Sequence, residues 1–141
     1  MKKKNLSIIG LGKMGEAIAK GLHDSDLGET YAITGTTRSE ESAKEVREHL
    51  KIQCTTDNAQ AIKSADLIFF AVKPHQAEMI LKENQQHFRS DQVIISICAA
   101  VTTEQLSKWS GGKASIIRAM PNTPCLIKRS EERRVGKECL R

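Results

Sequence analysis

The sequence predicts an α/β fold: a doubly wound parallel sheet with helices on both faces. Short apolar segments alternate with helical segments from residue 4 to residue 118. Two of the apolar segments, DLIFFAV and QVIISI, are nearly continuous, which is typical of strands buried on both faces. Three glycines stand between the first apolar segment and the first helix. Right-handed crossovers between parallel strands then predict the strand order 3-2-1-4-5-6.

The individual elements follow from apolar spacing and from capping residues. Aliphatic segments predict strands at Lys4–Gly10, Tyr31–Thr34, Ile52–Cys54, Asp66–Val72, Gln92–Ile97 and Ala114–Arg118. Helical patterns occupy Lys13–His23, Glu40–Leu50, Asn58–Lys63, His75–Phe88 and Thr103–Trp109. Ser39, Asp57 and Thr102 precede three of these helices as expected N-caps, and Gln105 can complete a capping box with Thr102.

Length and composition limit the class of protein. The chain has 141 residues, of which 39% are hydrophobic and 28% charged, enough for one soluble domain with a core. No apolar run approaches the ~20 residues of a membrane span, and the basic start MKKKNLSIIG lacks the apolar core of a signal peptide. We therefore expect a cytoplasmic protein with no membrane interaction.

Charge and cysteine usage exclude two further classes. Of the net charge of +5, residues 128–141 supply +3, and no basic face interleaved with aromatic residues is present, so we expect no nucleic-acid binding. The cysteines Cys54, Cys98, Cys125 and Cys139 form no CxxC pair and have no histidine at zinc-ligand spacing. We interpret them as reduced, buried thiols, and we expect no metal site.

The glycines Gly10, Gly12 and Gly15 form a GxGxxG pattern between a strand and a helix. This context is the fingerprint of a dinucleotide-binding (Rossmann) domain. Gly10 permits the sharp turn, Gly12 lets the backbone approach a pyrophosphate, and Gly15 lets the helix pack closely on the strand. The N–H groups at the start of the helix attract the phosphates. The alternative is a tight turn that binds no ligand.

The segment ITGTTRSEE contains the end of the second strand, which selects between the two nicotinamide cofactors. A site for NAD usually has an acidic residue there, bonded to the ribose 2′-hydroxyl. Here Thr36, Thr37, Arg38 and Ser39 occupy the position. Arg38 would attract a 2′-phosphate, and the hydroxyls of Thr37 and Ser39 could add hydrogen bonds. We predict NADP(H) as the cofactor; in the alternative, Arg38 is a surface residue and a following glutamate reaches the ribose.

Four segments together resemble one enzyme family. They are IGLGKMGEAIAKGL at the start, AVKPHQ (71–76), SICAAVTTEQL (96–106) and RAMPNTPCLI (118–127). Their sequence, order and spacing closely resemble the N-terminal domain of the pyrroline-5-carboxylate reductases, over nearly all of residues 5–127. The GLGxMG stretch is shared with β-hydroxyacid dehydrogenases, whereas the VKP and MPNTP stretches are more selective.

The resemblance implies an activity for the parent protein. It would reduce the C=N bond of 1-pyrroline-5-carboxylate, a small-molecule substrate, to L-proline with NAD(P)H, and the protein would supply alignment and electrostatics. The family's second half is a helical domain that forms the dimer and contacts the substrate, and residues 1–141 contain no counterpart. We therefore expect a homo-oligomeric parent reductase of proline biosynthesis, and a chain that binds cofactor with little or no turnover.

The resemblance also implies site residues, and it assigns no catalytic residue. The cofactor would contact Leu11, Gly12, Lys13 and Met14 at the pyrophosphate turn, Asn58 near the ribose, Ala71, Val72, Lys73 and Pro74 after the fourth strand, and Cys98 and Ala99 after the fifth. The nicotinamide and the substrate pocket would be bordered by Met120, Pro121, Asn122 and Thr123. Ala100 stands where the family usually has glycine. We assign no role to His75.

The end of the chain does not fit the domain. Residues 129–139, RSEERRVGKEC, resemble the translation of a sequencing-library adapter. Our hypothesis is that residues 1–127 form the NADP-binding domain and that residues 128–141 are a non-native tail; a charged, disordered natural end is the alternative. Two other functions stay open, a β-hydroxyacid-dehydrogenase-like NADP oxidoreductase and a non-catalytic nucleotide-sensing Rossmann module.

Overall fold

The computed structural model describes residues 2–121 and contains one sheet of six strands. The strands are β1 (Lys4–Ile9), β2 (Tyr31–Thr36), β3 (Gln53–Thr55), β4 (Leu67–Phe70), β5 (Val93–Ser96) and β6 (Ser115–Arg118). They lie in the order β3-β2-β1-β4-β5-β6, and every neighbouring pair is parallel. The predicted doubly wound sheet and its strand order are confirmed.

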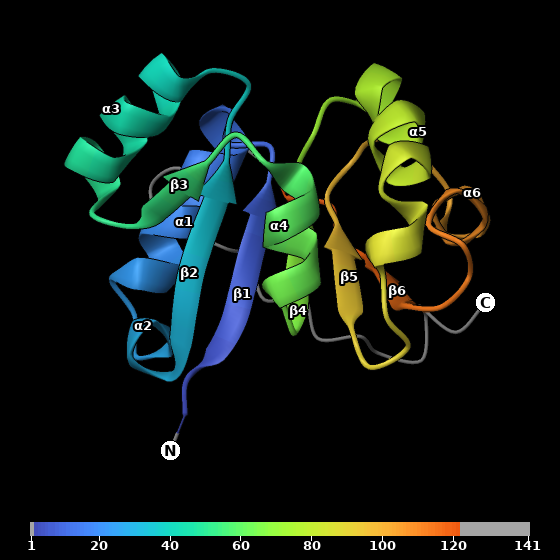
Figure 1. Ribbon diagram of the computed structural model, residues 1–141, viewed down its shortest axis with the longest axis horizontal. Coiled ribbons are helices and arrows are strands. Elements are labelled where there is room, and N and C mark those ends of the chain that lie inside the picture. Colours follow the sequence, from blue (N-terminus) through green and yellow to red (C-terminus); the bar gives the residue numbers. More distant parts are fainter. Residues whose placement is uncertain (1, 122–141) are drawn as a thin grey trace, which may run out of the picture.

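Helices connect the strands on both faces of the sheet (Figure 1). They are α1 (Lys13–His23), α2 (Leu27–Thr30), α3 (Glu40–Leu50), α4 (Asn58–Ser64), α5 (Pro74–Glu83) and α6 (Thr103–Trp109), with a 3-10 turn, η1 (Gln85–His87). The expected N-caps are confirmed, because the side chains of Ser39, Asp57 and Thr102 each accept a backbone hydrogen bond in the first turn of their helix.

The structure corrects the predicted elements at three places. The helix expected at 75–88 is interrupted at Asn84, whose side-chain amide donates to the carbonyl of Ile80 at 2.8 Å and so ends α5. The helix α2 was not predicted, because four residues are too short to show an apolar period. The second strand also extends two residues further than expected, to Thr36.

Two cores cover the two faces of the sheet. Along β1, Leu6 and Ile8 belong to the core under α1 and α3, whereas Ile9 belongs to the core under α4, α5 and α6. The alternation follows from the two-residue period of a strand. Between these apolar residues, the buried Ser7 hydroxyl donates to the carbonyl of Ala61 at 2.8 Å, which ties β1 to α4.

The carboxyl end of α4 is held by a glutamine that is completely buried. The Gln92 amide donates to the carbonyls of Ile62 at 2.7 Å and Ala65 at 2.8 Å, and its oxygen accepts from the backbone N–H of Arg89 at 2.8 Å. These bonds add donors to carbonyls at the end of the helix, where the Ala65 carbonyl also accepts from Nη2 of Arg89 at 3.1 Å. They also fix the orientation of α4, whose other end carries Asn58.

Within residues 2–121, no helix combines the length and the apolar character that a membrane span requires. The predicted domain boundary at residue 127 and the proposed non-native tail lie outside the described residues.

Candidate functional site

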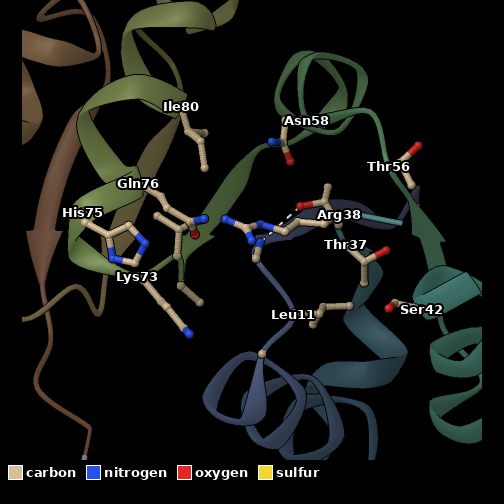
Figure 2. A pocket seen from close by; sticks show the side chains of 15 residues that line it. Leu11, Thr37, Arg38, Ser42, Thr56, Asn58, Lys73, His75, Gln76 and Ile80 are labelled. Atoms are coloured by element: carbon tan, nitrogen blue, oxygen red, sulfur yellow. Dashed lines mark hydrogen bonds between the residues drawn. The ribbon is translucent and has the colours of Figure 1, made fainter. Parts of the chain in front are cut away.

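A pocket of about 420 Å³ opens at the edge of the sheet where the parallel strands end (Figure 2). Its walls come from the turns that follow β1, β2, β3 and β4. The chain leaves β1 toward β2 on one side and leaves β4 toward β5 on the other, so the pocket lies at the point where the strand order reverses. Ligands of open α/β sheets bind at such a point.

The turn after β1 is fixed by the ends of both neighbouring strands. Gly10 has a φ of +90°, which is unfavourable for other residues. Its N–H donates to the Thr36 hydroxyl at 3.1 Å, and the N–H of Leu11 donates to the Thr36 carbonyl at 2.8 Å. On the other side, a Cβ at Gly10 would lie 2.8 Å from Cγ1 of Val72. The loop backbone is therefore held between β2 and β4.

The other two glycines of the motif have different surroundings. A Cβ at Gly15 would lie 2.5 Å from the Gly10 carbonyl oxygen, so only glycine lets α1 start this close to β1. A Cβ at Gly12 would meet no atom within 4 Å, and Gly12 lines the pocket. The space beside the Gly12 backbone is therefore open on the side that faces the pocket.

The helices around the pocket differ in how their N-termini are satisfied. Side chains cap α3, α4 and α6, but α1 begins after Gly12 and α5 begins after Lys73, neither of which provides a side-chain cap. The first N–H groups of a helix have no partner within the helix, and its dipole is positive there. The start of α1, beside Gly12, can therefore bind a phosphate group.

The side chains of the pocket favour an anionic ligand. Arg38, Lys73 and His75 are the ionisable side chains that line it, and neither aspartate nor glutamate does. The nearby acid Glu40 forms an ion pair with Arg47 on α3 instead. Within residues 2–121, no three histidine, cysteine or acidic side chains gather as a metal site would require.

The structure brings nine of the predicted cofactor residues together. They line the pocket: Gly10, Leu11, Gly12, Thr37, Arg38, Asn58, Ala71, Val72 and Lys73. Seven others lie outside the lining. Lys13, Met14 and Gly15 form the first turn of α1, Ser39 caps α3, Pro74 begins α5, and Cys98 and Ala99 follow β5.

Cys98, Met120 and Pro121 lie further along the same edge of the sheet, after β5 and β6. The Cys98 thiol is buried and donates to the Val72 carbonyl at 3.0 Å, and burial raises its pKa. It is a packed thiol with no thiolate character at neutral pH. Met120 and Pro121 follow β6, and the Met120 side chain is 69% exposed. Asn122 and Thr123 lie outside the described residues.

Six lining residues were not predicted as cofactor contacts: Thr36, Ser42, Thr56, His75, Gln76 and Ile80. Two of them, Gln76 and Ile80, are four residues apart on α5 and therefore share the face that looks into the pocket. The four-residue spacing of Gln76 and Ile80 could have been recognised in the sequence, because a helix was already expected after the VKP stretch. Ser42 lies in the first turn of α3, where its N–H is bonded to Ser39, and nothing in the sequence distinguished it from a surface serine.

The strand order and the glycine turn at the end of β1 define a Rossmann-like domain. The chain belongs to the family described as "NADP oxidoreductase coenzyme F420-dependent", whose sequence model matches residues 5–100. A particular enzyme recurs among its relatives. The pyrroline-5-carboxylate reductase of Escherichia coli (strain K12) is 35% identical over 125 residues, which cover 89% of this chain and 46% of that protein. The chain thus spans about half the length of the curated relatives it matches.

Solved structures agree with this relationship. A pyrroline-5-carboxylate reductase from Coxiella burnetii superimposes with a TM-score of 0.81 at 33% identity, over 90% of this chain and 47% of that one. The pyrroline carboxylate reductase of Plasmodium falciparum, solved with NADP bound, superimposes with a TM-score of 0.74 at 28% identity, over 90% of this chain and 45% of that one.

Proposed function

We propose that this chain binds NADP(H) and is the N-terminal domain of an enzyme that reduces 1-pyrroline-5-carboxylate to L-proline. The observation that carries the proposal is the pocket itself, where an uncapped helix N-terminus and open backbone at Gly12 lie beside Arg38, with no acidic side chain in the lining. The relatives named as pyrroline-5-carboxylate reductases support the choice of substrate.

The pocket residues fit a dinucleotide. The N–H groups at the start of α1 would bind the pyrophosphate, because no side chain caps them and Gly12 leaves the approach open. Asn58 would lie beside the adenosine ribose, and Lys73 would contact the cofactor at the end of β4. Hydride chemistry would be supplied by the bound cofactor, and the residues of this chain would hold and orient it.

The choice of NADP(H) over NAD(H) rests on the charges at the end of β2. Arg38 lines the pocket and carries a positive charge that a 2′-phosphate would meet. The acid Glu40, which could have bonded to a free 2′-hydroxyl, is paired with Arg47. The hydroxyl of Thr37, also in the lining, donates to the Ser39 carbonyl at 3.0 Å and accepts from the Cys54 thiol, whose Sγ lies 3.9 Å away.

We expect further substrate contacts to come from the part of the reductases that this chain does not span, since the chain covers 46% of the Escherichia coli relative. The proposal therefore includes a homo-oligomeric parent protein in the cytoplasm, and it expects a steady-state assay of the 141-residue chain to give little or no turnover. Robust turnover would contradict this part. The gene downstream of codon 127 separates the alternatives, since a long helical domain indicates the reductase and an early stop indicates a nucleotide sensor.

Cofactor selectivity tests the binding proposal directly. Arg38→Asp should weaken NADPH binding at least tenfold and leave NADH binding almost unchanged, because the new carboxylate repels the 2′-phosphate and accepts from a 2′-hydroxyl. Isothermal titration calorimetry with both cofactors measures the two constants. Lys113→Asp is the matched control, because it makes the same change of charge at an exposed loop position outside the pocket. Equal losses for both cofactors in Arg38→Asp would reject the assignment.

A further inference from the structure

Arg38 and Gln76 meet across the pocket from opposite walls. Arg38 follows the end of β2, and Gln76 lies in the first turn of α5, after β4. Both line the pocket, and Figure 2 shows their side chains pointing toward one another. Residues almost forty positions apart thus form a bridge over the space between the two strand ends.

Gln76 offers the Arg38 guanidinium a neutral acceptor. When the Gln76 amide is oriented with its oxygen toward the guanidinium, that oxygen accepts from Nε of Arg38 at 3.2 Å and lies in contact with Nη2. The orientation follows from the hydrogen-bond network, since the opposite one would set donors against donors. The backbone of Gln76 is anchored, because its backbone N–H donates to the Lys73 carbonyl at 2.9 Å and the adjacent Ala77 is completely buried.

Arg38 differs from two other arginines, which form ion pairs with acidic side chains. Arg47 pairs with Glu40, and Arg89 pairs with Asp91. Among the ion pairs of residues 2–121, none includes Arg38. A carboxylate at the place of Gln76 would neutralise the guanidinium and compete with any anionic ligand, whereas an amide holds it and leaves the charge.

We infer that Gln76 is a positioning residue that holds the Arg38 guanidinium in the pocket while leaving its charge and remaining donors free for the 2′-phosphate of NADP(H). The inference rests on the proposed function. A guanidinium has five N–H donors, and Gln76 accepts from the one at Nε and contacts Nη2, so others remain for phosphate. Because Arg38 is already held, less conformational entropy is lost when the phosphate binds.

Two substitutions of Gln76 test this in the full chain. Gln76→Leu removes the acceptor and should weaken NADPH binding about fivefold, the effect of releasing one flexible side chain. Gln76→Glu adds a competing carboxylate and should weaken NADPH binding about tenfold or more. NADH binding should stay within about twofold in both, since it has no 2′-phosphate. Gln86→Glu, at an exposed position of η1 outside the pocket, is the charge control.

A double-mutant cycle separates positioning from a direct contact. In an Arg38→Ala background, Gln76→Leu should have no further effect on NADPH affinity, because it acts through Arg38. Circular dichroism and thermal unfolding verify that each variant is folded. If NADPH and NADH affinities fall together, if neither changes, or if the leucine effect persists without Arg38, the inference is overturned. If one of these outcomes occurs while the wild-type chain binds NADPH more tightly than NADH, the proposed function remains intact. If the wild-type chain binds neither cofactor, both the inference and the proposed function are overturned.

Discussion

Gly15 lies directly against the carbonyl oxygen of Gly10, so that a Cβ at position 15 would stand 2.5 Å from that oxygen. This contact sets how closely α1 approaches the end of β1. It couples the stability of the domain to the shape of the pocket, because the Gly10 backbone is also bonded to Thr36 at the end of β2. The fold therefore needs glycine here whether or not a ligand is present.

Gly15→Ala should lower the free energy of unfolding by about 2–3 kcal/mol, because the methyl group forces backbone atoms apart. Gly21→Ala is the matched control on the same helix, since its Cβ would meet nothing within 4 Å. It should raise stability by about 0.5–1 kcal/mol through helix propensity. Urea unfolding measures both, and equal effects would contradict the close-contact argument.

Gly12→Ala should separate binding from stability. Its methyl group meets no protein atom, so the free energy of unfolding should change by less than about 1 kcal/mol. The same methyl group would project where the pyrophosphate approaches, so NADPH affinity should fall at least tenfold. Calorimetric titration beside urea unfolding gives both numbers. An unchanged affinity would show that Gly12 does not contact the cofactor.

Ala100→Gly should stabilise the protein. Ala100 has a φ of +59°, a left-handed conformation that is unfavourable for a residue with a Cβ. Glycine removes this strain but gains freedom in the unfolded chain, and the net gain should be about 0.5–1 kcal/mol. Ala99→Gly in the same turn, where φ is not positive, should give no gain. The difference in melting temperature between the two variants is the measurement.

Gln92→Leu should lower the free energy of unfolding by about 3 kcal/mol. The substitution keeps the volume of the side chain but removes the buried amide that donates to the carbonyls of Ile62 and Ala65 and accepts from the N–H of Arg89. The exposed Gln86→Leu serves as the control and should change stability by less than about 0.5 kcal/mol. A loss below about 1 kcal/mol at Gln92 would mean that water replaces the amide.

Stability should decline in mildly alkaline solution. Burial raises the pKa of the Cys98 and Cys54 thiols above the ordinary value of about 8.5, so the unfolded chain loses these protons first. The stabilisation is complete below about pH 8.5 and is lost as the pH rises through the folded pKa, by at most about 1.4 kcal/mol per pH unit for each thiol. Urea unfolding between pH 7 and 10 measures the slope. Cys98→Ala should reduce it, and an unchanged slope would contradict the assignment.

The order of the helices and strands could be predicted from the sequence, because each of them depends on local sequence. The apolar stretches at 66–72 and 92–97 are short and flanked by helical patterns, which favours buried strands, and Ser39, Asp57 and Thr102 marked helix starts that the structure confirms. The end of α5 was misjudged, because it depends on a side-chain bond from Asn84 that competes with the continuing helix.

For the pocket, the sequence by itself determined the glycine turn and the basic residue at the end of β2, since both are short motifs that follow a strand. Only the tertiary structure decided which distant side chains face them. Gln76 and Ile80 reach the site because β4 lies beside β1 and α5 starts at the same edge of the sheet. Strand pairing and helix packing are long-range, so the contact between Arg38 and Gln76 exists only once the sheet has assembled.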